Sequence, residues 1–156
     1  MVRMTKYTTK LTENKRVVLE KEVSMNYPLL SHKITSPGDA VEIGREFMRI
    51  HEKPEEYMYM ICMNTKNKVI GVFEISHGTV SSSLVSAREV FQKALLANAV
   101  SIIVMHNHPS GDCTASREDI DVTKRLVEAG KIVGIEVLDH IIIGDGYSSL
   151  KEIGHV

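Results

Sequence analysis

One segment constrains the fold of this chain more than any other: SIIVMHNH at residues 101–108, followed by PSGDCTASRED at 109–119. The first part is a short, nearly continuous apolar run, which is typical of a strand buried on both faces of a sheet. A Pro-Ser-Gly turn follows, and Ser116 with Asp119 three residues later matches a capping box that opens a helix to about residue 129. This strand, turn and helix predict a mixed sheet covered by helices.

The rest of the chain shows strand-like and helix-like patterns in turn. The first 15 residues are expected to form a mobile polar arm, and residues 16–24 a strand. A helix is expected at 40–52 after Ser36, and a second helix from a capping box at Ser86 to about Ala99. The remaining elements are a hairpin of strands at 55–64 and 68–76, extended chain at 78–85, and final strands at 135–143 and 147–150. We expect two regions: an N-terminal arm with one strand over 1–33, and a single domain over 34–156.

The overall composition excludes several classes of protein. The chain has 156 residues, the length of one ordinary domain, and a formal net charge of -1, so the whole molecule has no basic field that would attract nucleic acid. Its two cysteines are far apart and form no disulfide framework, which fits a reducing compartment. Since no apolar run is long enough to span a membrane and the N-terminus does not resemble a signal peptide, we expect a cytoplasmic protein without a membrane partner.

The end of the buried strand has the spacing of a metal site. His106 and His108 are two residues apart on a strand, so their side chains point to the same face and can bind one ion. Imidazole suits zinc, and a catalytic zinc has three protein ligands and one open position. Asp119 in the first turn of the next helix can supply the third ligand. Zn²⁺ bound there would lower the pKa of a coordinated water to about 7.

Two further residues complete the predicted hydrolytic site. Glu74 lies in the apolar strand at 68–76, where a charged side chain is costly to bury, and we expect it to accept a proton from the water. Ser116 can donate its hydroxyl to a developing oxyanion. Each residue also has a purely structural explanation: Ser116 and Asp119 can act only as a helix cap, and Glu74 can point to solvent at a sheet edge.

Spacing excludes several better-known metal sites. The zinc deaminases need H-x-E followed by P-C-x-x-C, and the chain contains neither. The helical motif H-E-x-x-H of metalloproteases is also absent. The letters H-N-H at 106–108 do not indicate an HNH nuclease, because the named residues of that family are spread over a much longer motif.

The pattern H-x-H-x(7)-S-x(2)-D with an upstream glutamate resembles the signature of the JAMM (JAB/MPN+) metalloproteins. Several longer stretches look like the RadC branch of this superfamily, and the likeness covers roughly residues 34–153. They are ITSPGDA, NTKNKVIG, HGTVSSSLVSAREVFQKALLANA, HNHPSGD and EVLDHIIIG. RadC-type proteins are often labelled DNA repair proteins and commonly carry an N-terminal helix-hairpin-helix region, which is not found in the first 33 residues here.

The resemblance implies an α/β (α+β) fold: a single-domain three-layer sandwich of the cytidine-deaminase-like, JAB/MPN type, with a mixed β-sheet flanked by helices. It implies the following site: zinc ligands His106, His108 and Asp119, a proton-transferring Glu74 and an oxyanion-stabilising Ser116. His140 matches the RadC pattern and is expected to support the ligands. HNHPSGD is commonly followed by Pro-Thr-Pro-Ser in RadC proteins, whereas Cys113 begins Cys-Thr-Ala-Ser here. This departure should loosen the loop without removing a ligand. Cys113 is close enough in sequence to serve as a spare metal ligand or a redox-sensitive inhibitor, and an ordinary loop thiol is the favoured interpretation.

Three functions compete at this stage. The first is zinc-dependent, metallopeptidase-like hydrolysis of an amide or isopeptide bond in a peptide substrate. The second is a metal-dependent nuclease of the RadC DNA-repair type, since an activated water can also attack phosphorus; net charge does not favour DNA as the partner. The third is a non-catalytic interaction module that retains zinc, although structural zinc is usually bound by four protein ligands. The sequence does not predict the oligomeric state.

Overall fold

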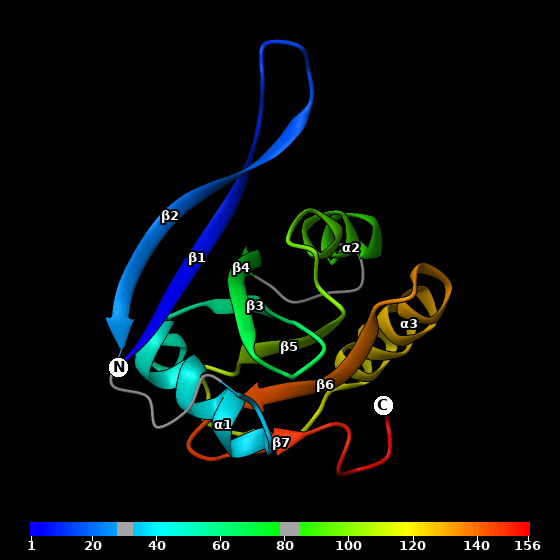
Figure 1. Cartoon of the computed structure of the whole chain (residues 1–156). Coiled ribbons are helices and arrows are strands. Elements are labelled where there is room, and N and C mark those ends of the chain that lie inside the picture. The colour runs from blue at the N-terminus through cyan, green and yellow to red at the C-terminus, as the bar shows by residue number, and fades with distance from the viewer. Residues whose placement is uncertain (28–32, 79–84) are drawn as a thin grey trace.

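A seven-stranded mixed sheet forms the centre of the computed structural model, which describes residues 1–27, 33–78 and 85–156 (Figure 1). Residues 79–84 of the expected extended segment lie outside this description. The strand order across the sheet is β2-β1-β4-β3-β5-β6-β7. The pairs β1–β4 and β5–β6 are parallel and the other pairs are antiparallel. The strands are β1 Val2–Leu11, β2 Val17–Tyr27, β3 Glu56–Met63, β4 Val69–Gly78, β5 Ser101–Asn107, β6 Glu136–Ile143 and β7 Tyr147–Ser149.

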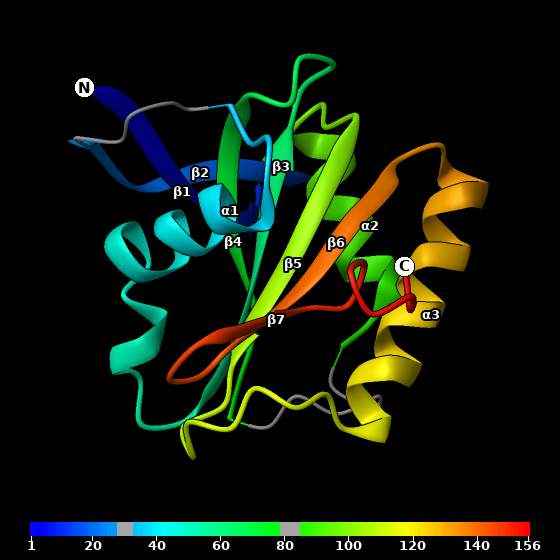
Figure 2. The same ribbon diagram turned by 90° about the horizontal axis from the view of Figure 1, so that it is seen from below.

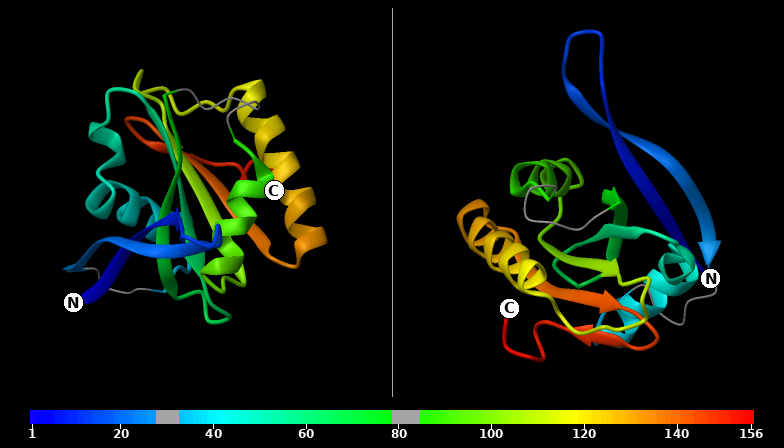
Figure 3. Two further views of the ribbon diagram at one scale, coloured as in Figure 1. Left: turned by 90° about the horizontal axis from the view of Figure 1, so that it is seen from above. Right: turned by 180° about the vertical axis from the view of Figure 1, so that it is seen from behind.

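Helices cover both faces of the sheet and make three layers (Figures 2 and 3). Helix α1 (Pro37–Glu42) and the turns after it pack on one face, and α2 (Ala87–Leu96) and α3 (Arg117–Val133) pack side by side on the other. Each interface has its own apolar core. The structure therefore confirms the predicted single-domain α/β sandwich with a mixed sheet.

Strand β5 lies between the two cores and is buried along its whole length. Ile102 and Val104 contact the α2–α3 side, whereas Ile103 and Met105 contact the α1 side. This explains why the strand reads as a continuous apolar run in the sequence. The same alternation assigns His106 to the α2–α3 side of the sheet.

The N-terminal region differs from the prediction. Residues 1–15 were expected to form a mobile arm, but Val2–Leu11 is a strand that pairs antiparallel with Val17–Tyr27. This hairpin joins the sheet through Lys6 and Tyr7, which pair with β4, and its far end projects away from the body of the molecule (Figure 1). The strand predicted at 16–24 is confirmed as part of β2, whereas Val2–Leu11 is largely polar and partly exposed and has no apolar alternation that would predict a strand.

The helix expected at 40–52 is divided. After α1 the chain forms a π-helical turn at Ile43–Phe47 and a separate 3-10 turn at Ile50–Glu52, with Arg49 in a left-handed conformation between them. A Cβ atom on Gly44 would lie 2.5 Å from the Met105 sulfur and 2.9 Å from Ile143 Cδ1, so any larger residue where this segment packs on β5 would displace these side chains. Hydrophobic periodicity alone does not show this interruption.

The two long helices also differ from the prediction in detail. Ser86 precedes α2, but its hydroxyl makes no capping bond, so the predicted capping box is wrong; the backbone bond from Val90 N–H to Ser86 O starts the helix. Helix α2 ends at Leu96 rather than near Ala99, and α3 continues to Val133, where Gly134 adopts a left-handed conformation. In the described ranges, no helix is long and apolar enough to cross a membrane.

Candidate metal centre

The three predicted ligands meet at the end of β5. The Nε2 atoms of His106 and His108 lie 3.0 Å apart. The Asp119 carboxylate places one oxygen 3.1 Å from His106 Nε2 and the other 3.4 Å from His108 Nε2. In a tetrahedral zinc site with bonds of about 2.0–2.1 Å, neighbouring ligand atoms lie roughly 3.3–3.4 Å apart. The three groups are therefore already spaced to bind one small cation.

Local structure places the third ligand. Ser116 is the N-cap of α3, and its hydroxyl accepts a hydrogen bond from Asp119 N–H at 3.1 Å. The Asp119 carboxylate in return accepts a bond from Ser116 N–H at 2.7 Å. This reciprocal capping box confirms the predicted helix start and fixes the orientation of the carboxylate. The short loop after β5 thus brings a residue of α3 to the two histidines.

Hydrogen bonds on the far side of each ring direct a lone pair toward the cluster. His108 Nδ1 lies 2.7 Å from the backbone carbonyl oxygen of Asp112, which can only accept, so the proton is on Nδ1 and Nε2 is bare. His106 Nδ1 is bonded to His140 Nε2 at 2.8 Å. With a proton on Nδ1 of each ring, the cluster presents two bare imidazole nitrogens and a carboxylate, which are all acceptors, and a bound cation satisfies all three. The residues therefore fit a zinc ion.

The electrostatics of the cluster are consistent with this. In the metal-free cluster a proton can take the place of the cation: burial opposes ionisation of Asp119, but hydrogen bonds from His106 and His108, donated when these rings are protonated, hold the pKa of its carboxyl well below the usual range. The bond to Asp119 raises the pKa of His108, against desolvation, and the Asp112 carbonyl and the charge of Glu56 act in the same direction. Burial lowers the pKa of His140 far below its ordinary value, so this ring is neutral.

Glu74 is not brought to the cluster. It pairs with Tyr59, and Tyr59 also pairs with Met105, so Glu74 lies on the α1 side of the sheet, opposite the face that carries His106. Its carboxylate contacts Lys6 Nζ at 3.4 Å. The prediction of Glu74 as the proton acceptor relies only on its being an acid in an apolar strand. Which side of the sheet Glu74 faces depends on the alternation of side chains along β4 and on a register shift between Met58 and Tyr59.

Glu56 is the acidic residue that sequence reasoning missed. It begins β3 two residues before Met58, and Met58 pairs directly with His106. Since alternate residues of a strand share a face, Glu56 lies on the same face as His106, at the end of the sheet where His108 emerges. Its charge acts to raise the pKa of His108, in line with this placement. Glu56 lies at the start of the strand predicted at 55–64, so the sequence placed it beside an apolar run just as it did Glu74.

Asn107, between the two histidines, fixes the backbone around Glu56. Its side-chain oxygen accepts a bond from Tyr57 N–H at 2.7 Å, and its amide donates to the carbonyls of Glu55 at 2.9 Å and Lys53 at 3.3 Å. Asn107 is 2% exposed and lies on the face opposite the histidines. One buried amide thus holds the main chain on both sides of Glu56.

The remaining predicted residues lie at different distances from the cluster. Cys113 is in the loop before α3, with its sulfur 3.9 Å from the Gly111 carbonyl oxygen, and it does not belong to the group of metal-binding side chains found in the described ranges. His140 contacts His106 directly, as expected. Ser116 is exposed, and because its oxygen accepts the capping bond its hydroxyl proton can be donated elsewhere.

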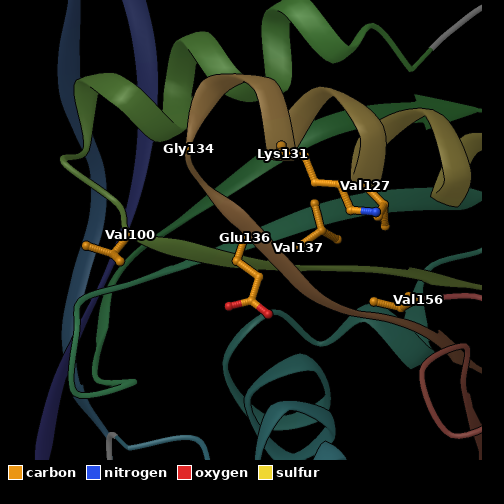
Figure 4. Close-up of a pocket in the computed structure, with 8 residues that line it drawn as sticks. Val100, Val127, Lys131, Gly134, Glu136, Val137 and Val156 are labelled. Atoms are coloured by element: carbon orange, nitrogen blue, oxygen red, sulfur yellow. The ribbon is translucent and has the colours of Figure 1, made fainter.

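Two pockets differ in their relation to the cluster. A polar pocket of about 260 Å³ lies beside His108 and is lined by Lys53, Asn107 and Asp145 among others. A second pocket, of about 450 Å³, lies at the opposite end of α3, where Val127, Val137 and Val156 line it together with Lys131 and Glu136 (Figure 4). The lining of the larger pocket includes none of the predicted site residues, so the pocket beside His108 is the one relevant to chemistry at the cluster.

Comparisons with known proteins identify the family of the chain. Two similar proteins are the UPF0758 proteins of Caldanaerobacter subterraneus subsp. tengcongensis, 54% identical over 123 residues, and of Clostridium acetobutylicum, 53% identical over 125 residues. These alignments cover 78% and 80% of this chain and 52% and 54% of the relatives, so the chain spans about half the length of the curated relatives it matches. The family model described as RadC-like JAB domain matches residues 34–155, and the chain therefore belongs to the RadC-like JAB domain family.

Proposed function

We propose that this protein is a zinc-dependent hydrolase of amide or isopeptide bonds. The observation that carries the proposal is the convergence of His106, His108 and Asp119, with both Nε2 atoms and the carboxylate oxygens facing one point. Three protein ligands leave a fourth position for water, as in catalytic rather than structural zinc sites. Zinc bound there would supply Lewis acidity and a water with a pKa of about 7.

We assign proton transfer to Glu56 instead of Glu74. A general base must reach the attacking water and then the leaving nitrogen, so it has to lie on the ligand face of the sheet. Glu56 meets this requirement, whereas Glu74 lies on the other face in contact with Lys6. The Glu56 carboxylate accepts a proton from the attacking water and returns it to the leaving amine.

Ser116 is proposed to stabilise the tetrahedral oxyanion. Its hydroxyl proton is not used by the capping box, because the oxygen acts there as an acceptor. A donor at the first turn of α3 also benefits from the positive end of the helix dipole. The polar pocket beside His108 gives the substrate chain room on the solvent side of the ligands.

The test is an activity screen with paired variants. Zinc-loaded protein is incubated with peptide and isopeptide libraries, and with phosphodiester substrates in parallel. We expect metal-dependent amide cleavage that falls about 10²- to 10⁴-fold in Glu56→Gln and persists in Glu74→Gln. Cleavage of phosphodiesters alone would replace the proposal with a nuclease. An absence of cleavage in every arm would refute it, and loss only in Glu74→Gln would refute the assignment of Glu56.

A further inference from the structure

A line of buried hydrogen bonds continues behind the metal ligand His106. His106 Nδ1 lies 2.8 Å from His140 Nε2, and His140 Nδ1 lies 2.6 Å from the Thr123 hydroxyl oxygen. The Thr123 hydroxyl in turn lies 2.7 Å from the backbone carbonyl oxygen of Asp119. His106, His140 and Thr123 are each 0% exposed. The line starts at one ligand on β5, passes through β6 and returns on α3 to the residue that provides another ligand.

When each ring carries one proton, as an imidazole that binds a metal must, only one arrangement of protons satisfies all of these bonds. The Asp119 carbonyl can only accept, so the Thr123 hydroxyl donates its single proton to it. Thr123 must then accept from His140, which places the proton of the neutral His140 ring on Nδ1. His140 Nε2 is consequently an acceptor, and His106 donates to it from Nδ1. This leaves His106 Nε2 without a proton, facing His108 and Asp119.

We infer that His140 and Thr123 are positioning residues that fix the tautomer of His106 for metal binding. Metal-bound histidines generally donate their other ring N–H to a partner that holds the ring in place. Here that partner is a second neutral histidine, which can accept only while a further group accepts from it. Thr123 is that group. The hydroxyl of Thr123, two hydrogen bonds away from His106, therefore decides which nitrogen of the ligand is bare.

The inference rests on the proposed metal centre but not on hydrolysis. If Thr123 loses its hydroxyl, His140 Nδ1–H has no acceptor in a dry interior, which is costly. Moving the His140 proton to Nε2 removes that cost, because Nε2–H can donate to His106 Nδ1. His106 then carries its proton on Nε2, the atom that must bind the metal. The metal affinity falls although no ligand has changed.

The test compares Thr123→Val with Thr123→Ser. Valine has nearly the shape of threonine without the hydroxyl, and serine keeps the hydroxyl. Zinc affinity is measured by competition with a chelator of known affinity, on the full chain. We expect Thr123→Val to weaken zinc binding about 10- to 100-fold, as seen when partners of metal-bound histidines are removed, and Thr123→Ser to bind zinc like the wild type.

Ser149→Ala is the matched control for a general loss of stability. Ser149 is 2% exposed and donates to Asp139 at 2.6 Å, and Asp139 accepts from the backbone N–H of His140 at 2.7 Å, so this network reaches the main chain of β6 but not the imidazole ring of His140. We expect Ser149→Ala to lower the urea midpoint without changing the zinc affinity. Equal zinc affinity in wild type and Thr123→Val, or equal loss in Ser149→Ala, would overturn the inference.

A measurement on the unmodified protein covers the case in which Thr123→Val does not fold. Long-range ¹H–¹⁵N NMR spectra of the zinc-loaded protein distinguish the two tautomers of each ring. Protons on Nδ1 of both His106 and His140 support the inference, and a proton on His140 Nε2 overturns it. A protein that shows this tautomer pattern and binds zinc but cleaves nothing would refute the proposed hydrolase and leave the role of Thr123 intact.

Discussion

Replacing Asn107 with alanine tests whether the residue between the two histidines serves Glu56. The Asn107 side chain makes three bonds to the main chain of the segment that carries Glu56, at 2.7, 2.9 and 3.3 Å. Alanine removes all three and leaves Tyr57 N–H without its acceptor. Since Asn107 points away from the cluster, the positions of His106 and His108 should not depend on its side chain.

The size of the effect follows from these bonds. A buried hydrogen bond contributes about 0.5–1.5 kcal/mol net, so three bonds correspond to a loss of roughly 2–4 kcal/mol in the free energy of unfolding. A shift of about 1 Å in a catalytic group can cost about 10²-fold in rate. We therefore expect Asn107→Ala to lower the turnover of any substrate found for the wild type by about one to two orders of magnitude, with little change in zinc affinity.

The measurements are urea denaturation, zinc competition, amide hydrogen exchange at Tyr57 and turnover. Asn64→Ala is the matched control, because Asn64 also bonds to backbone N–H groups, those of Lys66 and Lys68, at the opposite end of β3. We expect fast exchange at Tyr57 and loss of turnover only in Asn107→Ala. Unchanged exchange at Tyr57 would refute the structural reasoning, and equal loss of turnover in Asn64→Ala would refute the link to Glu56.

Three further predictions concern the loop and the cluster. A Cβ on Gly144 would lie 2.2 Å from the Gly111 carbonyl oxygen, so Gly144→Ala should shift the loop after β5 and cost about 1–3 kcal/mol by urea denaturation; an unchanged midpoint would contradict this. Ser116→Ala removes the capping acceptor of Asp119 N–H and should cost about 1 kcal/mol in a thermal melt, which an unaltered melting temperature would contradict. In metal-free protein the raised pKa of His108 stabilises the fold at pH values below 6.5, its ordinary pKa, and this contribution is lost as the pH rises through the folded-state pKa. The lowered pKa of Asp119 stabilises the fold at pH values above 3.8, and this contribution is lost at lower pH. The lowered pKa of His140 adds stability above pH 6.5 and so acts in the opposite direction. The His108 contribution is therefore measured as the difference in urea midpoint between wild type and His108→Gln without zinc, which should shrink as the pH rises from about 6 to about 9, and a difference that grows over this range would contradict the assignment.

The parts of the site that lie within one continuous segment could be predicted from the sequence. His106 and His108 follow from the two-residue period of a strand, and Asp119 follows from a capping box that starts three residues earlier. These relations depend only on local geometry, which is the same in every strand and helix N-terminus. The structure brings these three side chains together as the sequence indicated.

The parts of the site that depend on pairing between strands could not be predicted in this way. Whether Glu74 or Glu56 faces the ligands depends on the register of β3 against both β4 and β5, and a shift of one residue after Met58 changes the answer. The strand Val2–Leu11 was missed for a related reason, because its pairing with β2 leaves much of it in solvent and gives no apolar pattern. Both errors concern pairing between segments that are distant in sequence.

Asp119 shows why the local part of the site is nevertheless robust. Its carboxylate accepts from Ser116 N–H at 2.7 Å and at the same time lies 3.1 Å from His106 Nε2, so one side chain caps α3 and faces the cluster. The backbone carbonyl of the same residue accepts from Thr123, which connects through His140 to His106. A movement of the first turn of α3 would therefore disturb the carboxylate ligand and the tautomer of His106 together. The helix start and the metal centre are one structural unit, and a substitution that loosens the cap should weaken metal binding even where every ligand is retained.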